Sequence, residues 1–172
     1  MPLHLLVEAR PGAGKTTALR RLAELLQEAG TRVAGFTTEE IRERGRRVGF
    51  AVEAFSGERG TLAHVSFAGP PRVGKYGVDL AEFERIALPA LRAPSVGVVL
   101  IDELGKMELA SERFRNVVED LMDGSVVVAA TVQAGRHPFT DRLKERFEVV
   151  RLTPANRDQL PAELAERLIP GP

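Results

Sequence analysis

The chain of 172 residues contains no cysteine and no tryptophan, and it has only one tyrosine. The absence of cysteine excludes a disulfide framework, a zinc site built on thiolates and a thiol nucleophile. No apolar run approaches the ~18 residues that span a bilayer, and the amino terminus lacks the basic segment of a signal peptide. We therefore expect a cytoplasmic protein without a membrane segment, folded as one domain over residues 1–172.

The sequence also lacks net charge, because Lys and Arg total 24 and Asp and Glu also total 24. No segment is basic enough for the electrostatic footprint of a nucleic-acid-binding protein, so we expect no strong nucleic-acid interaction. We also expect a monomer. Lysine is scarce and occurs only at Lys15, Lys75, Lys106 and Lys144, three of which follow a glycine. Where arginine is otherwise preferred, a retained lysine indicates a need for a compact point charge.

Short apolar runs alternate with amphipathic stretches along the chain. Apolar runs predict buried strands at residues 3–7, 32–36, 96–101, 126–132 and 149–152. Apolar residues at helical spacing predict helices at 18–29, 78–91, 111–124, 141–146 and 157–168. Residues 48–54 and 62–67 predict an antiparallel hairpin, whereas 37–45 are polar and 68–77 predict a loop. The pattern indicates a three-layer α/β protein with a mostly parallel sheet and an antiparallel hairpin addition.

A glycine-rich segment, Gly-Ala-Gly-Lys-Thr at 12–16, lies between the first strand and the first helix. This Walker A pattern, or P-loop, surrounds phosphates with backbone N–H groups, directs Lys15 to the β and γ phosphates and offers the Thr16 hydroxyl to Mg²⁺. The full pattern begins with a glycine that is Ala9 here, and alanine would cost roughly 1–2 kcal/mol if that position needs a positive φ. A dinucleotide-binding fingerprint fails, because its third glycine is replaced by Thr17.

A second motif ends the apolar run at 96–101 in Asp102-Glu103. A carboxylate at the carboxyl end of a buried strand can hold Mg²⁺ directly or through water, which is the Walker B arrangement. We expect Thr16 and Asp102 to hold the metal and Glu103 to orient the attacking water. The alternative for Glu103 is a cap on the following helix.

The motifs together resemble the P-loop nucleoside-triphosphate phosphatases of the THEP type, also called cancer-related nucleoside-triphosphatases. The resemblance covers most of the chain and rests on residues 12–17, 35–42, 72–78, 101–109, 130–132 and 156–158. It implies Mg²⁺-dependent hydrolysis of nucleoside triphosphates, including ATP, GTP, CTP, UTP and deoxy forms, to diphosphate and phosphate. It also implies a sheet in which another strand lies between the P-loop strand and the Asp102 strand.

The expected catalytic residues are Lys15, Glu103 and Lys106. The expected nucleotide-binding residues are Ala9, Arg10, Pro11, Gly12, Ala13, Gly14, Lys15, Thr16, Thr17, Ile101, Asp102, Glu103, Leu104, Gly105 and Lys106. Lys75 or Lys106 could supply a second cation to the triphosphate, the alternative being a solvated loop lysine. Further candidates are Glu39, Glu40 and Arg42 for water or phosphate, Thr131 and Gln133 for sensing the γ-phosphate, and Asn156 and Arg157 for the base. Asn156 and Arg157 do not match the Asn-Lys-x-Asp signature of guanine-binding proteins, so we expect no strict GTP preference.

Two other functions are compatible with the same motifs. A kinase would pass the phosphoryl group to a small nucleoside or nucleotide, with residues 68–77 or 42–47 as its lid. A nucleotide-switched binding module would use slow hydrolysis as a timer. Phosphate release without an acceptor separates the kinase from the hydrolase, and a partner retained only in the triphosphate state would indicate the switch.

Overall fold

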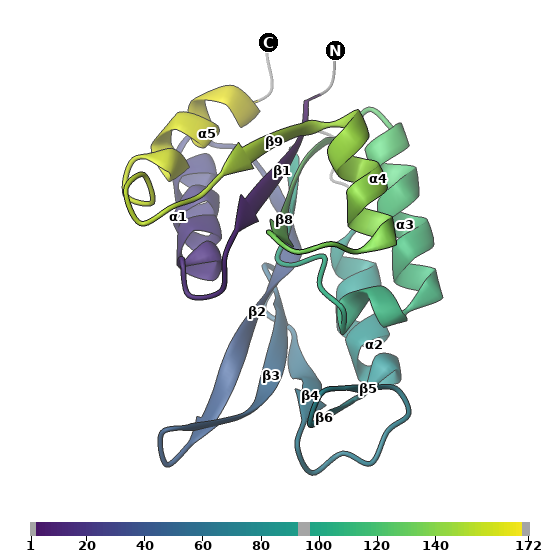
Figure 1. Ribbon diagram of the computed structural model, residues 1–172. Helices are drawn as coiled ribbons and strands as arrows, with labels where there is room; N and C mark the ends of the chain where they lie inside the picture. Colours follow the sequence, from purple (N-terminus) through teal and green to yellow (C-terminus); the bar gives the residue numbers. More distant parts are fainter. Residues whose placement is uncertain (1–2, 93–96, 170–172) are drawn as a thin grey trace.

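The computed structural model describes residues 3–92 and 97–169, and within them the strands form one nine-stranded sheet (Figure 1). The strands are β1 (His4–Ala9), β2 (Val33–Glu43), β3 (Arg46–Ala54), β4 (Arg59–His64), β5 (Arg72–Val73), β6 (Tyr76–Val78), β7 (Val98–Ile101), β8 (Val127–Gln133) and β9 (Glu148–Arg151). Their order is β5-β6-β4-β3-β2-β7-β8-β1-β9. Strand β8 lies between β1 and β7, which confirms the implied insertion between the P-loop and Asp102 strands.

Helices cover both faces of the parallel part of the sheet, which confirms the three-layer prediction (Figure 1). The helices are α1 (Lys15–Glu28), α2 (Leu80–Ala90), α3 (Glu112–Asp123), α4 (Pro138–Arg146) and α5 (Leu160–Leu168), with a 3-10 turn at Glu108–Ala110. No helix in these two ranges is long and apolar enough to cross a membrane.

Alternate residues of β1 divide the apolar core between the two faces. Leu5 belongs to the cluster that includes α1 and α5, and Leu6 belongs to the cluster that includes α2, α3 and α4. In the second cluster the rings of Phe36, Phe83 and Phe114 contact one another, with centroids 5.0 to 5.8 Å apart. Each such buried side chain contributes roughly 1.5–3 kcal/mol, so the sheet is a stiff support for the loops at its carboxyl edge.

Strand β2 is the main departure from the prediction. We expected it to end at Phe36, but it continues to Glu43 and pairs antiparallel with β3. Cross-strand ion pairs hold the polar part in a strand, such as the pair between Glu40 and Arg47. The expected loop at 68–77 contains β5 and the start of β6. Strands β2 to β6 form an antiparallel extension that projects past the carboxyl end of β7 (Figure 1).

Several predicted boundaries shift, and a side-chain cap explains the start of α2. The side chain of Asp79 accepts a hydrogen bond from the amide of Glu82, so α2 begins after it and Val78 stays in β6. The predicted cap at Ser111 is confirmed, because its hydroxyl accepts from the amide of Phe114 at 3.1 Å. Helix α4 begins at Pro138, earlier than expected, and α5 begins at Leu160, later than expected.

Replacing Gly35 should destabilise the protein strongly. Gly35 lies in β2 beside β7 with φ of 110°, and an added Cβ would lie 1.8 Å from the carbonyl oxygen of Leu100. Overpacking and backbone strain together give an expected loss of about 3 kcal/mol of unfolding free energy in Gly35→Ala, measured by urea denaturation. Gly135→Ala is the matched control, because a Cβ there meets nothing within 4 Å. Equal midpoints for the two variants would contradict the expectation.

Candidate active site

The glycine-rich loop connects the end of β1 to the first residue of α1. Gly12 and Gly14 have φ of 81° and 91°, in the left-handed region that favours glycine. Ala9 is the last residue of β1 and has extended backbone, so the alanine carries no left-handed strain and the expected penalty there does not arise. The loop therefore places the start of α1, with Lys15 and Thr16, over the carboxyl edge of the sheet.

Lys15 contacts Glu103 directly in this structure. The Nζ atom of Lys15 lies 2.8 Å from Oε2 of Glu103, and the two side chains are 13% and 19% exposed. The Nε2 atom of Gln133, at the end of β8, donates to the other carboxylate oxygen at 3.2 Å. The N-cap positions of the 3-10 turn and of α3 are Met107 and Ser111, so Glu103 is the cap of neither.

Thr16 and Asp102 also meet. The Thr16 hydroxyl donates to Oδ2 of Asp102 at 2.6 Å and lies 3.1 Å from the Thr38 carbonyl, while Thr131 donates to Oδ1 at 2.8 Å. Asp102 is 1% exposed, and this burial raises the pKa of its carboxyl against the lowering effect of the two hydroxyls.

These oxygen donors fit a hard divalent cation. Mg²⁺ is usually bound by one or two protein oxygens, several waters and the phosphates of a substrate. Thr16 and Asp102 supply such oxygens side by side. Across residues 3–92 and 97–169, no cluster of three His, Asp or Glu side chains could form an all-protein cage. The donor set therefore suits a metal that arrives with a phosphate ligand.

A cleft of about 930 Å³ lies at this edge of the sheet. The candidates that line it are Pro11, Gly12, Gly14, Lys15, Thr16, Thr17, Glu39, Glu40, Arg42, Asp102, Glu103, Lys106 and Gln133. Four other candidates are buried in the apolar core, namely Ala9, Ala13, Ile101 and Leu104. Arg10, Lys75 and Gly105 also lie outside its lining, and Thr131 is fully buried beneath Asp102.

Asn156 and Arg157 do not reach the cleft. The Asn156 side chain accepts from the amide of Thr153 and donates to the carbonyl of Arg151, both at 2.8 Å. These bonds hold the turn after β9, and Arg157 is exposed beside it. The structure thus gives Asn156 a local structural role and does not bring the pair to the other candidates.

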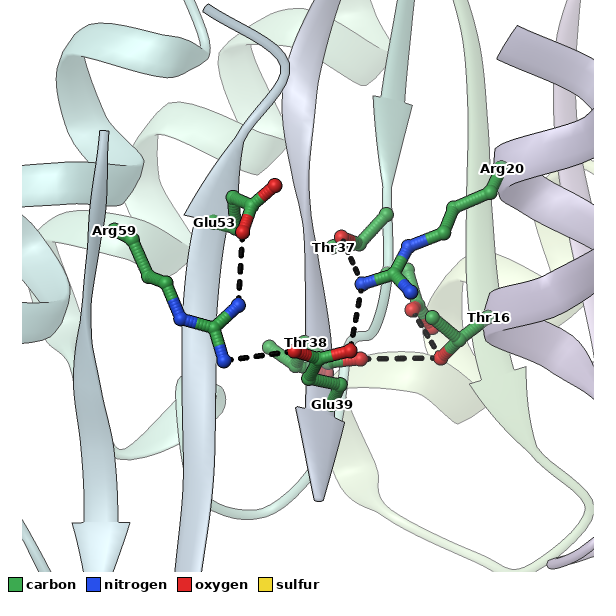
Figure 2. Close-up of polar contacts among 8 residues, drawn as sticks. Thr16, Arg20, Thr37, Thr38, Glu39, Glu53 and Arg59 are labelled. Atoms are coloured by element: carbon green, nitrogen blue, oxygen red, sulfur yellow. Dashed lines mark hydrogen bonds and ion pairs between the residues drawn. The ribbon is translucent and has the colours of Figure 1, made fainter. Parts of the chain in front are cut away.

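Glu39 links the P-loop helix to the antiparallel extension, as Figure 2 shows. Arg20, one turn after Thr16 on α1, donates to Oε2 of Glu39 at 3.0 Å. Arg59 on β4 lies 2.7 Å from Oε1 and also binds Glu53. The hydrogen bond from Arg59, followed by that from Arg20, lowers the pKa of Glu39. Glu39, on β2, therefore joins α1 to β4 through its two arginine partners.

Several residues that line the cleft were not among the individual candidates: Arg47, Phe50, Tyr76, Met107 and Glu108. Only Phe50 lies outside both the possible lid segments and the family motif segments. Glu108 is 3% exposed although it lies in a charged segment. Burial, and then the nearby charge of Glu103, raise the pKa of Glu108 well above its ordinary value of 4.5. A glutamate normally predicts exposure, so the sequence held no signal for this burial.

Glu108→Gln should change how stability depends on pH. Folded Glu108 keeps its proton above pH 4.5 whereas the unfolded chain loses it, so folding takes up a proton. The unfolding free energy of the wild type should then fall as pH rises from 4.5, by up to about 1.4 kcal/mol per pH unit. Glutamine has no such proton, so the advantage of Glu108→Gln should grow with pH in urea titrations. The exposed Glu112→Gln is the control; parallel curves for Glu108→Gln and wild type would contradict the expectation.

The sheet order, the glycine-rich loop and the buried aspartate beside its threonine define a P-loop nucleotide-binding protein of the α/β class. A sequence profile of the family described as NTPase matches residues 4–165, and the chain belongs to that family. It is 43% identical over 166 residues to "Nucleoside-triphosphatase THEP1" of Thermotoga petrophila, which covers 94% of this chain and 90% of the relative. The human "Cancer-related nucleoside-triphosphatase" is 38% identical, with 93% of each chain covered. The crystal structure of THEP1 from Aquifex aeolicus superposes with a TM-score of 0.85 at 33% identity, over 96% of this chain and 99% of the other.

Proposed function

We propose that this protein hydrolyses nucleoside triphosphates to diphosphate and phosphate in a Mg²⁺-dependent reaction with broad base tolerance. The observation that carries the proposal is the convergence of Lys15, Thr16, Asp102 and Glu103 through direct contacts in one cleft. The names of the relatives, all nucleoside-triphosphatases, support the same reaction. Tolerance of different bases is supported by the position of the two residues considered for base recognition, Asn156 and Arg157, which lie outside the cleft lining.

In the proposed mechanism the phosphates bind the amides of the loop at 12–16 and the ammonium of Lys15. Thr16 and Asp102 would hold Mg²⁺, which supplies charge neutralisation at the phosphates. Lys15 exchanges Glu103 for the phosphates on nucleotide binding, which leaves the Oε2 atom of Glu103 able to accept a hydrogen bond from water. Gln133 keeps hold of Oε1 and so fixes the direction in which Glu103 faces.

The experiment that tests the proposal is phosphate release from a panel of NTPs and dNTPs, with and without Mg²⁺. We expect release from every member with Mg²⁺ and almost none after chelation. A kinase would be nearly silent without an acceptor, so silence with Mg²⁺ present overturns the proposal. Release from a single nucleotide would overturn the broad base tolerance.

Of the two candidate second cations, the geometry favours Lys106. Lys106 lines the cleft, whereas Lys75 lies outside it with its Nζ atom 5.5 Å from the centre of the Tyr76 ring. A cation that stabilises the transition-state charge is worth on the order of tenfold or more in rate. We therefore expect Lys106→Ala to lower kcat at least tenfold and Lys75→Ala to stay within about twofold of wild type. Steady-state phosphate release checks both, and equal rates for the two variants would remove Lys106 from the mechanism.

A further inference from the structure

The cleft is larger than the phosphate site and has two ends. We define one end by the lining residues of the glycine-rich loop, 11, 12 and 14–17, together with Asp102 and Glu103. The other end, here called the distal pocket, is lined by Glu40, Arg42, Arg47, Phe50, Tyr76 and Lys106. All but Lys106 come from the antiparallel extension, which projects past the end of β7 (Figure 1). None of the steps proposed for hydrolysis uses the extension part of this pocket.

The direction of β2 places the distal pocket relative to the phosphates. The carbonyl of Thr38 accepts from Thr16, so β2 passes the proposed metal position at that residue. Glu40 and Arg42 follow on the same face, about 7 Å and 13 Å farther along the strand. The metal and Lys15 act at the β and γ phosphates, and the nucleoside leaves from the α-phosphate at the opposite end of the chain. Glu103 follows β7, which pairs with β2, whereas the glycine-rich loop follows β1 on the far side of β8. This sheet order puts the distal pocket on the Glu103 side of the cleft, where we place the start of an in-line attack on the γ-phosphate.

Two guanidinium groups in the pocket share one carboxylate. Arg42 lies 2.7 Å from Glu40 Oε2, and Arg47 lies 3.2 Å from Oε1. Arg42 also donates from Nη1 to the Gly45 carbonyl at 2.9 Å. The Arg42 and Arg47 side chains are 55% and 46% exposed, so the N–H groups that these bonds leave over can meet a ligand. Lys106 adds positive charge from the facing loop. The pocket thus carries an excess of positive charge in a chain with no net charge.

Arg47 is held in place by the aromatic residues beneath it. Its guanidinium carbon lies 5.4 Å from the centre of the Phe50 ring and 5.9 Å from that of Tyr76. Its Nε atom donates to the Tyr76 hydroxyl at 2.9 Å. A planar guanidinium fixed in this way suits the oxygens of a phosphate better than a mobile lysine does. Leu62, Val73 and Met107 supply apolar walls beside it.

We propose that the distal pocket binds a second small molecule, a phosphate-bearing anion with an apolar body, of the chemical class of the nucleoside 5′-monophosphates. Its phosphate binds Arg47 and Arg42, and its body lies against the apolar walls. The placement rests on the proposed function, because the nucleotide at the P-loop defines the attack side. A ligand there excludes the attacking water, so occupancy of the pocket lowers phosphate release.

The test measures phosphate release against ATP concentration at fixed Mg²⁺, with AMP, GMP, CMP or UMP as the probe. A probe in the distal pocket lowers kcat, and excess ATP does not restore it. A probe that competes at the P-loop raises only KM and is displaced by ATP. Inorganic phosphate and adenosine should each inhibit more weakly than the monophosphate, and equal inhibition by adenosine would overturn the role given to the two arginines. Full relief by ATP, or no inhibition by any monophosphate, overturns the proposal.

Two variants test whether the monophosphate inhibits by binding in the distal pocket. Arg47→Ala should raise the inhibition constant of the monophosphate about tenfold or more, since a charge-assisted hydrogen bond is lost. Tyr76→Phe keeps the ring and removes only the hydroxyl that holds Arg47, so a smaller shift in the same direction is expected. Arg113→Ala, 74% exposed on α3, is the matched control. An inhibition constant unchanged in both pocket variants overturns the proposal. Failure of the proposed function is distinct, because it would show as no phosphate release without any monophosphate.

Discussion

Lys15→Ala should reduce turnover by about 10³-fold and weaken nucleotide binding at least tenfold, because a preorganised cation at the phosphates is removed. The environment makes the loss severe. Lys15 is the cation that contacts Glu103, and the carboxyl of Asp102 lies in the same cleft. Without the ammonium, the carboxylate of Glu103 faces the incoming triphosphate uncompensated, so repulsion adds to the lost attraction.

Phosphate release and equilibrium binding of a fluorescent triphosphate measure the two effects of Lys15→Ala separately. Lys75→Ala removes the same chemical group from an exposed position outside the cleft and serves as the control. Circular dichroism of both variants shows whether the fold is kept. Turnover within tenfold of wild type in Lys15→Ala would contradict the proposed role of the lysine.

The sequence predicted those parts of the site that depend on local pattern. A run of buried apolar residues, the glycines at 12 and 14 and an amphipathic helix place Lys15 and Thr16 with little help from the rest of the fold. The buried apolar run before Asp102 likewise predicts a strand that places this carboxylate at the edge of the sheet. The insertion of β8 between β1 and β7 was implied by the family resemblance, because strand order is not written in any single segment.

The antiparallel extension could not be predicted so easily, because its strands are stabilised by partners distant in sequence. Residues 37–43 are polar, and the pairs that hold them come from β3, β4 and α1. The same limit applies to Glu108, whose burial depends on the packing of the whole cleft. Asn156 illustrates the opposite case, in which a residue predicted to bind a ligand has a local role. Its side chain accepts a hydrogen bond from the amide of Thr153 within the turn.

The pairing of Lys15 with Glu103 connects binding to catalysis. In this structure each group satisfies the other, which keeps two partly buried charges compensated. Nucleotide binding must compete with this pair, and the competition lowers affinity while it prepares Glu103 for water. The two residues should therefore affect binding in opposite directions, although both are needed for turnover.

Glu103→Gln should lower kcat by about 10² to 10⁴-fold while nucleotide binding is kept or becomes tighter. The amide cannot accept a proton from water, yet it nearly matches the carboxylate in shape and releases Lys15 for the phosphates. Single-turnover phosphate release and equilibrium binding give the two quantities. Glu145→Gln, an exposed change on α4, is the matched control and should equal wild type in both. Unchanged turnover would exclude Glu103 as the residue that orients water, and weakened binding would contradict the competition between Glu103 and the phosphates for Lys15.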